Sequence, residues 1–204
     1  MKLYFAPGAC SLSPHIVLRE LGLPFDLVKV DMSSKKTSDG DDFASINPKG
    51  YVPTLKTDDG KVLTEGVAIN QFLADKKPES GLAPANGTFE RYKLQEMLNF
   101  ISTEIHKTYS PMFNSSLPDA ARAIFLDKLK KRFGELDEIL SKHDFLTGSK
   151  FTIADAYLYT VLRWAPKFKI DLKEWPALAR FYDRVDSRPA VKAALEAESS
   201  AKAA

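Results

Sequence analysis

The sequence has a single cysteine among its 204 residues and lacks any long apolar run. Cys10 therefore has no internal disulfide partner, which suits a reducing compartment. No stretch of 18 consecutive apolar residues is present, so no segment is predicted to span a membrane. The apolar start of the chain breaks at Pro7-Gly8, too early for the core of a secretory signal. We expect a cytoplasmic protein with no membrane partner.

An excess of charge of either sign is also missing. The chain carries 29 basic and 27 acidic side chains, for a net charge of +2. No cluster of basic residues is interleaved with aromatic residues, so a nucleic-acid partner is not indicated. Internal repeats are absent as well. The length suits one large domain or two modest ones.

The first 80 residues alternate between strand-like and helix-like patterns. Ser13-Pro14 predicts the start of the first helix, with serine as N-cap and proline in the first turn. A crossover through that helix makes the first two strands parallel, because such connections are right-handed. A turn at residues 57–60 makes the last two strands an antiparallel hairpin. We predict a four-stranded mixed sheet with helices, its strands at residues 2–6, 27–30, 54–56 and 62–64.

A segment rich in proline and glycine, residues 78–87, predicts a linker. Beyond it the strand signal disappears and apolar residues recur at helical spacing. We therefore predict an α+β domain over residues 1–77 and an all-α domain over residues 88–204. The expected helices of the second domain cover residues 92–110, 120–140, 152–164, 176–185 and 190–198.

The segment Lys49-Gly50-Tyr51-Val52-Pro53-Thr54-Leu55 has features of a ligand-binding edge. A proline at the first position of a strand leaves the hydrogen-bond ladder intact, and Pro53 restricts Val52 to an extended backbone. An extended residue can offer its N–H and C=O to a ligand, as an added strand would. A cis bond before Pro53 would turn these groups outward, although only about 5–6% of such bonds are cis. A proline that merely begins an edge strand is the simpler alternative.

Cys10 lies in the loop between the first strand and the first helix. Helix N-termini favour anions such as thiolate, and open α/β sheets bind ligands at the carboxyl ends of their strands. Ser11 could donate a second hydrogen bond to a sulfur there. Position 13 is serine, so chemistry with two neighbouring thiols is excluded and chemistry with one thiol is not. The alternative is that Cys10 is a small buried apolar residue.

Glu65 and Gly66 begin the helix that follows the last strand. The free N–H groups of a helix N-terminus can bind a carboxylate, while Glu65 can bind an ammonium group. A carboxylate and an ammonium on one carbon form an amino-acid head group. Together with Val52 and Cys10, this pair would fit an extended peptide with a thiol in its middle. An acidic residue that only caps the helix is the ordinary alternative.

Two motifs follow in the helical half. Asn99, Thr103 and His106 are spaced four and three residues apart, which predicts one polar face lining a cleft or an interface. A solvated face of an amphipathic helix is the alternative. Thr152 and Asp155 have the spacing of a capping box, which we interpret as structural.

The chain resembles a glutathione S-transferase of the bacterial beta class. The resemblance covers the whole length and rests on Ala9-Cys10-Ser11, Val52-Pro53, Glu65-Gly66, His106 and residues 148–155. It implies a thioredoxin-like first domain followed by an all-helical second domain. It also implies a homodimer that conjugates glutathione to small hydrophobic electrophiles in detoxification, with no metal and no cofactor beyond glutathione.

The resemblance assigns residues to each part of glutathione. It implies a cis Pro53, with Val52 pairing with the cysteinyl backbone and Glu65 with Gly66 holding the γ-glutamyl end. Lys35 contacts the glycyl end, with its neighbour Lys36 as a rival. The remaining assignments are Cys10, Ser11 and His106 as catalytic residues at the sulfur, Asn99 beside them, and Thr103 with Glu104 at the glutathione of the other subunit.

One position departs from the family pattern, and one pocket is poorly defined. The family usually has serine where this chain has Gly66, so a hydroxyl contact to glutathione is lost. A charged hydrogen bond of this kind contributes roughly 1.5–3 kcal/mol, so we expect weaker binding. The candidates for the electrophile pocket are Tyr109, Met112, Phe113 and Trp164, although such residues more often belong to a core.

The expected chemistry is attack by the glutathione thiolate, formed when the protein lowers the pKa of the thiol from about 8.5 toward neutral. Two alternatives remain. In the first, Cys10 forms a mixed disulfide with glutathione and the protein is a thiol-disulfide reductase or peroxidase. In the second, the protein binds glutathione or another ligand without catalysis, since one fold can serve several functions.

Overall fold

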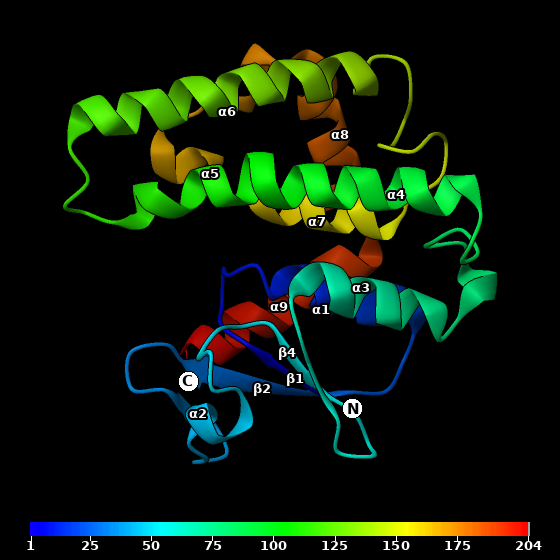
Figure 1. The fold of residues 1–204 in the computed structure, drawn as a ribbon, viewed down its shortest axis with the longest axis vertical. Helices are drawn as coiled ribbons and strands as arrows, with labels where there is room; N and C mark the ends of the chain where they lie inside the picture. The colour runs from blue at the N-terminus through cyan, green and yellow to red at the C-terminus, as the bar shows by residue number, and fades with distance from the viewer. Residues whose placement is uncertain (204) are drawn as a thin grey trace. The chain divides into compact units, whose positions relative to one another are not determined.

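The computed structural model describes residues 1–203, and its contacts divide the chain into two units. Unit 1 comprises Met1–Ser80 and the described residues from Asp186 onward, and unit 2 is Gly81–Val185. The expected helical domain extended to the end of the chain. Instead, the terminal helix α9 (Pro189–Ala203) packs against α1 (Leu12–Leu21) and belongs with the sheet (Figure 1). Val191 and Ala194 on α9 are buried, which explains why the helix is not a separate element.

The sheet of unit 1 is mixed and has five strands in the order β3-β2-β1-β4-β5. β1 is parallel to β2 and β4 is antiparallel to β5, as predicted. β4 is also antiparallel to β1. The prediction of four strands missed one, because a two-residue strand in the polar loop pairs antiparallel with β2. The strands are β1 (Lys2–Phe5), β2 (Asp26–Asp31), β3 (Lys36–Thr37), β4 (Thr54–Lys56) and β5 (Val62–Thr64).

The first helix begins earlier than expected. α1 has Ser11 as its N-cap residue, two residues before the predicted Ser13. Pro14 is accommodated because the N–H groups of a first helical turn have no partner within the helix. The helix ends at Gly22, which adopts a left-handed conformation. Cys10 therefore lies directly before the N-cap. The other helical elements of unit 1 are α2 (Phe43–Ile46), α3 (Gly66–Asp75), the 3₁₀ turn η1 (Pro78–Ser80) and α9.

Unit 2 is helical in the described residues, and α6 runs alongside the helix that α4 and α5 build together (Figure 1). That helix is interrupted by a π-helical stretch, η2 (Ile101–His106), where a continuous α-helix was expected. The other bounds are α4 (Phe89–Phe100), α5 (Lys107–Tyr109), η3 (Ser110–Phe113), α6 (Asp119–Leu140), α7 (Ile153–Leu162), η4 (Ala165–Phe168), η5 (Leu172–Glu174) and α8 (Pro176–Asp186).

The cores of both units are apolar. In unit 1, β1 and β4 contribute buried Leu3 and Leu55, and α1 contributes Ile16 and Leu18. Every residue of α7 is buried, so this helix is the centre of unit 2. Along residues 1–203, no helix has the length and apolar character that crossing a bilayer requires.

Candidate active site

A buried asparagine holds the segment from Lys49 to Leu55 in place. The Asn47 side chain donates from Nδ2 to the Tyr51 carbonyl oxygen at 2.8 Å and to Thr54 Oγ1 at 3.0 Å. Thr54 Oγ1 donates in turn to the same Tyr51 oxygen at 3.1 Å. The Val52–Pro53 bond is cis, as the resemblance implied. Because Asn47 and Thr54 are both buried, their hydrogen bonds hold the backbone on either side of Val52 from the interior of unit 1.

The thiol of Cys10 lies beside this segment. Its Sγ donates to the carbonyl oxygen of Val52 at 3.4 Å, and the residue is partly exposed. The backbone of Val52 is also the group expected to pair with a bound peptide. In unit 1, the sequence-predicted catalytic cysteine and the sequence-predicted binding edge are therefore in direct contact.

Ser11 is engaged elsewhere. Its hydroxyl donates to the Ala6 carbonyl oxygen at 3.3 Å and accepts from the Ala6 N–H at 3.2 Å. The side chain is completely buried. Sequence reasoning expected this hydroxyl to face a sulfur, whereas it joins the end of β1 to the start of α1. Its observed contribution is to hold the loop that carries Cys10.

Glu198 of α9 supports the same loop, and sequence reasoning missed it. The Gly8 N–H donates to Glu198 Oε2 at 3.2 Å, and His15 Nδ1 lies 3.2 Å from Oε1. Arg19 Nε donates to His15 Nε2 at 2.9 Å. Since arginine can only donate, His15 carries its proton on Nδ1 and donates it to the carboxylate. His15 and Glu198 are both buried, so the pair is structural.

The structure distinguishes the two neighbouring lysines. Lys35 has a left-handed backbone, with φ of 56°, and its Nζ donates to the Gly50 carbonyl oxygen at 3.1 Å. Lys36 lies in β3 and is exposed. Only Lys35 is therefore brought to the segment from Lys49 to Leu55 by a hydrogen bond seen here, which favours it over its rival.

Glu65 and Gly66 stand at the start of α3, as predicted. Glu65 is the N-cap residue, with a φ of 68° that is uncommon outside glycine, and its carboxylate is largely exposed. Lys49 Nζ lies 3.5 Å from Glu65 Oε1. A Cβ placed on Gly66 would lie 3.6 Å from Pro53 Cγ, so the helix start adjoins the cis-proline turn. The carboxylate of Glu65 is accessible to an ammonium group.

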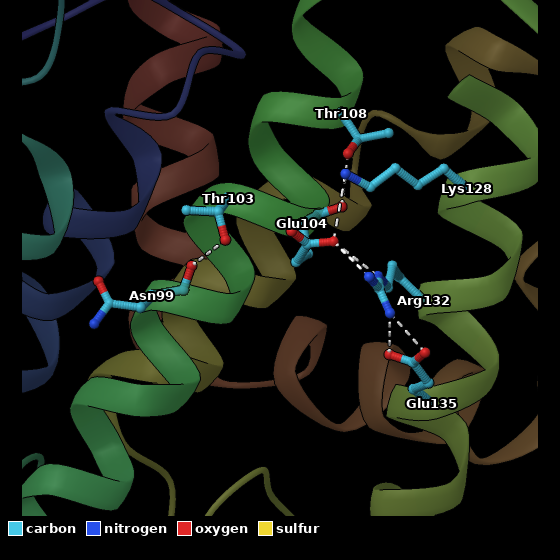
Figure 2. A network of polar contacts seen from close by, with 7 residues as sticks. All are labelled: Asn99, Thr103, Glu104, Thr108, Lys128, Arg132 and Glu135. Atoms are coloured by element: carbon cyan, nitrogen blue, oxygen red, sulfur yellow. Dashed lines mark hydrogen bonds and ion pairs between the residues drawn. The ribbon is translucent and has the colours of Figure 1, made fainter. Parts of the chain in front are cut away.

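The polar stripe expected on the long helix is divided. In the π-helical stretch each hydrogen bond spans five residues, so each residue turns less around the axis than in an α-helix. Thr103 remains near Asn99, with Thr103 Oγ1 donating to the Asn99 carbonyl oxygen at 3.0 Å, and both side chains are exposed (Figure 2). His106 faces α7 instead. The prediction that all three residues share one face was wrong at His106.

His106 is fixed by two aromatic neighbours. Its Nδ1 lies 2.6 Å from the hydroxyl oxygen of Tyr157 on α7. The Trp164 ring approaches it edge-on with a centroid distance of 5.0 Å, and the Tyr157 ring at 5.8 Å. His106 is half-buried. Tyr157 was missed, although a tyrosine in a largely apolar helix is a signal that its hydroxyl has a partner.

Glu104 is paired with cations from α6. Arg132 Nε and Nη2 lie 2.9 Å and 2.7 Å from Glu104 Oε2, and Lys128 Nζ lies 3.4 Å from it. Arg132 Nη1 also donates to both carboxylate oxygens of Glu135 (Figure 2). The hydrogen bond from Arg132 lowers the pKa of Glu104 below its ordinary value. Two cations from α6 therefore hold the partly exposed carboxylate of Glu104 in position.

The four candidates for the electrophile pocket separate into two pairs. Tyr109 and Met112 are buried, and burial raises the pKa of Tyr109. Phe113 is 44% exposed and Trp164 is half-buried. The rings of Phe113 and Tyr109 both pack edge-on against Trp164. Of these four residues, only Phe113 and Trp164 present accessible surface, whereas Tyr109 and Met112 are buried.

The capping box at the start of α7 is confirmed. The Asp155 carboxylate accepts from the Thr152 N–H at 2.7 Å, from the Thr152 hydroxyl at 2.8 Å and from the Leu146 N–H at 2.9 Å. Asp155 is completely buried, and loss of hydration raises its pKa to about 6 against the opposing effect of these donors. No cluster of three or more histidine, cysteine or acidic residues within residues 1–203 has the arrangement of a metal site.

Comparison with known proteins identifies the family to which this chain belongs. The family described as glutathione S-transferase, N-terminal domain, matches residues 8–76, and the corresponding C-terminal domain matches residues 100–189. Glutathione S-transferase GstA of Escherichia coli O157:H7 is 46% identical over 97% of this chain and 98% of its own length.

Two solved structures are close in fold. A sphingomonad glutathione S-transferase complexed with glutathione has a TM-score of 0.95 at 45% identity, covering 98% of this chain and 99% of its own. The bacterial beta-class glutathione S-transferase of Sphingomonas chungbukensis has a TM-score of 0.93 at 45% identity, covering 97% and 98%. The chain therefore belongs to the glutathione S-transferase family, as an enzyme of its bacterial beta class.

Proposed function

We propose that this glutathione transferase is a cytoplasmic homodimer that joins the glutathione thiolate to small hydrophobic electrophiles as a detoxification step, with no further cofactor. The 3.4 Å contact between Cys10 Sγ and the Val52 carbonyl oxygen carries the assignment of the site. If the cysteinyl backbone of glutathione pairs with Val52, its sulfur must lie close to the side chain that already touches Val52. That side chain is Cys10.

In unit 1, each part of the tripeptide has a candidate partner. Val52 lies directly before cis-Pro53 and the start of β4. Its backbone offers hydrogen bonds to the cysteinyl residue. Glu65 takes the α-ammonium of the γ-glutamyl end, and the first N–H groups of α3 at Gly66 take its carboxylate. Lys35 takes the glycyl carboxylate. The exposed carboxylate of Glu65 and the position of Lys35 at Gly50 support these assignments.

The helical unit is proposed to contribute to the reaction and to the electrophile pocket. His106 donates a hydrogen bond to the thiolate. Asn99 reaches the same sulfur from the exposed face of the helix, and Thr103 and Glu104 contact the glutathione bound to the other subunit. Phe113 and Trp164 form the apolar wall for the electrophile. In this proposal Tyr109 and Met112 support that wall from behind, because both are buried.

The test compares Cys10→Ala with the unchanged enzyme in two assays: conjugation of glutathione to an activated aryl halide, and reduction of a glutathione mixed disulfide. Conjugation should persist in the variant at a reduced rate, because glutathione supplies its own nucleophile. Loss of both activities, with a glutathione adduct on Cys10 in the mass spectrum of the unchanged enzyme, would favour the reductase. Binding of glutathione with no turnover of halide, peroxide or disulfide would favour a non-catalytic binding protein.

Sedimentation velocity tests the proposed dimer independently of catalysis. At micromolar concentrations, the molecular mass obtained from sedimentation should be twice the chain mass of 22.7 kDa if the protein is a homodimer. Glu104→Gln should then raise the KM for glutathione with the dimer intact, if the partner subunit uses that carboxylate. A monomeric enzyme with full activity would exclude any contribution from the second subunit.

A further inference from the structure

The hydrogen bond between His106 and Tyr157 joins a phenol to one nitrogen of the imidazole, so its direction is linked to which nitrogen of the neutral ring carries the proton. The Tyr157 oxygen lies 2.6 Å from His106 Nδ1. A phenol donates readily through its O–H, and a neutral imidazole has one nitrogen that accepts and one that donates. When Nδ1 accepts from a neighbour, the proton of the neutral ring must be on Nε2.

We propose that Tyr157 is a positioning residue that holds His106 as the Nε2–H tautomer. The functional part of this inference rests on the proposed role of His106 toward the glutathione sulfur. A thiolate is stabilised by a donor and repelled by a lone pair. The Nε2–H tautomer turns a neutral donor away from Tyr157, whereas the other tautomer would present a lone pair in the same direction.

Tyr157 is itself held firmly. It lies in the middle of α7 with 5% of its surface exposed. The start of that helix is anchored by the three hydrogen bonds to Asp155. A phenol on such a buried helix keeps its position without the entropy loss that a mobile side chain would incur.

The imidazole ring is also fixed in orientation. The Trp164 and Tyr157 rings meet it at interplanar angles of 62° and 77°, with the hydrogen bond at Nδ1 defining the edge that faces α7. Two edge-to-face contacts and one hydrogen bond leave the ring little freedom to flip. With the ring held in this orientation, the proposed O–H donation from Tyr157 to Nδ1 favours the proton on Nε2.

The experiment reads the tautomer directly, from long-range proton–nitrogen correlation spectra of the full-length enzyme at a pH where the ring is neutral. The chain has only three histidines, and His106→Asn identifies the signals of His106 by their loss. Tyr157→Phe removes the hydroxyl and keeps the ring. Tyr159→Phe is the matched control, because it removes a buried phenol hydroxyl from the same helix, one that accepts from Arg163 at 3.0 Å.

The unchanged enzyme and Tyr159→Phe should show the proton of His106 on Nε2, and Tyr157→Phe should show a mixture of both tautomers. In the conjugation assay Tyr157→Phe should lower kcat severalfold more than Tyr159→Phe does. A proton on Nδ1 in the unchanged enzyme, or an unaltered tautomer in Tyr157→Phe, would overturn the inference. Full activity in His106→Asn would instead remove His106 from the proposed function and leave the tautomer result standing.

Discussion

Replacing Gly66 by serine should strengthen the binding of glutathione. Gly66 begins α3, and its backbone lies outside the left-handed region that only glycine adopts readily. An added Cβ would lie 3.6 Å from Pro53 Cγ, an ordinary van der Waals contact. The site therefore has room for a serine without movement of its neighbours. A hydroxyl at this position can donate to the carboxylate of the γ-glutamyl end.

The expected size of the effect follows from one charged hydrogen bond. Such a bond contributes roughly 1.5–3 kcal/mol. Since 1.4 kcal/mol corresponds to a factor of ten, the Kd of glutathione should fall by about 10- to 100-fold. Isothermal titration calorimetry with S-methylglutathione measures this affinity without turnover.

Gly66→Ala is the matched control for this prediction. It adds the same Cβ and restricts the unfolded chain to the same extent. The free energy of unfolding of both variants, measured in urea, should therefore exceed that of the unchanged enzyme by up to about 1 kcal/mol. Only the serine variant should bind more tightly. Equal affinities for serine and alanine would refute the hydroxyl argument, and weaker binding by serine would refute the placement of the γ-glutamyl end at α3.

Three further substitutions test other parts of the structure. Ser11→Ala should lower the free energy of unfolding by about 1–3 kcal/mol in urea, because it leaves the buried N–H and C=O of Ala6 without their hydroxyl partner; unchanged stability would contradict this. Asp155 binds its proton up to about pH 6 when folded but only to about pH 4 when unfolded, so stability is lost as the pH rises between these values. The stability of the unchanged enzyme minus that of Asp155→Asn should therefore fall by up to about 3 kcal/mol from pH 4 to pH 6, and a rise would show that the donors outweigh burial. Arg132→Met should raise the pKa of Glu104 toward its ordinary value in a carbon-13 NMR titration, with a stability change within about 1 kcal/mol because the pair is partly exposed.

The fold could be predicted where burial imposes a period on the sequence. Alternating and helical apolar patterns located four of the strands and the principal helices, because each buries one continuous face. β3 was missed because Lys36 and Thr37 pair with β2 through their backbone alone. The start of α1 was misplaced because Ser13-Pro14 carries a valid signal two residues inside the helix, where proline is still tolerated.

Candidate site residues could be predicted from the sequence only where they lie next to a recognisable strand end or helix start. Cys10, Val52 and Glu65 are marked by the strand ends and helix starts on which they stand. The π-helical turn before His106 left no such mark, because Ile101 and Ile105 keep the apolar spacing of an ordinary helix. Contacts between distant residues, such as Gly8 with Glu198, depend on tertiary packing that no local pattern encodes.

The attachment of Gly8 to Glu198 has a consequence for the order in which the enzyme is made. The loop that carries the thiol leaves the ribosome early, whereas a carboxylate that holds it, Glu198, follows 190 residues after Gly8. The strands of unit 1 can pair early, whereas the loop of Cys10 gains this support only after α9 has been released and docked. A nascent chain that stalls during synthesis of unit 2 would thus carry Cys10 on a loop that lacks its contact with Glu198.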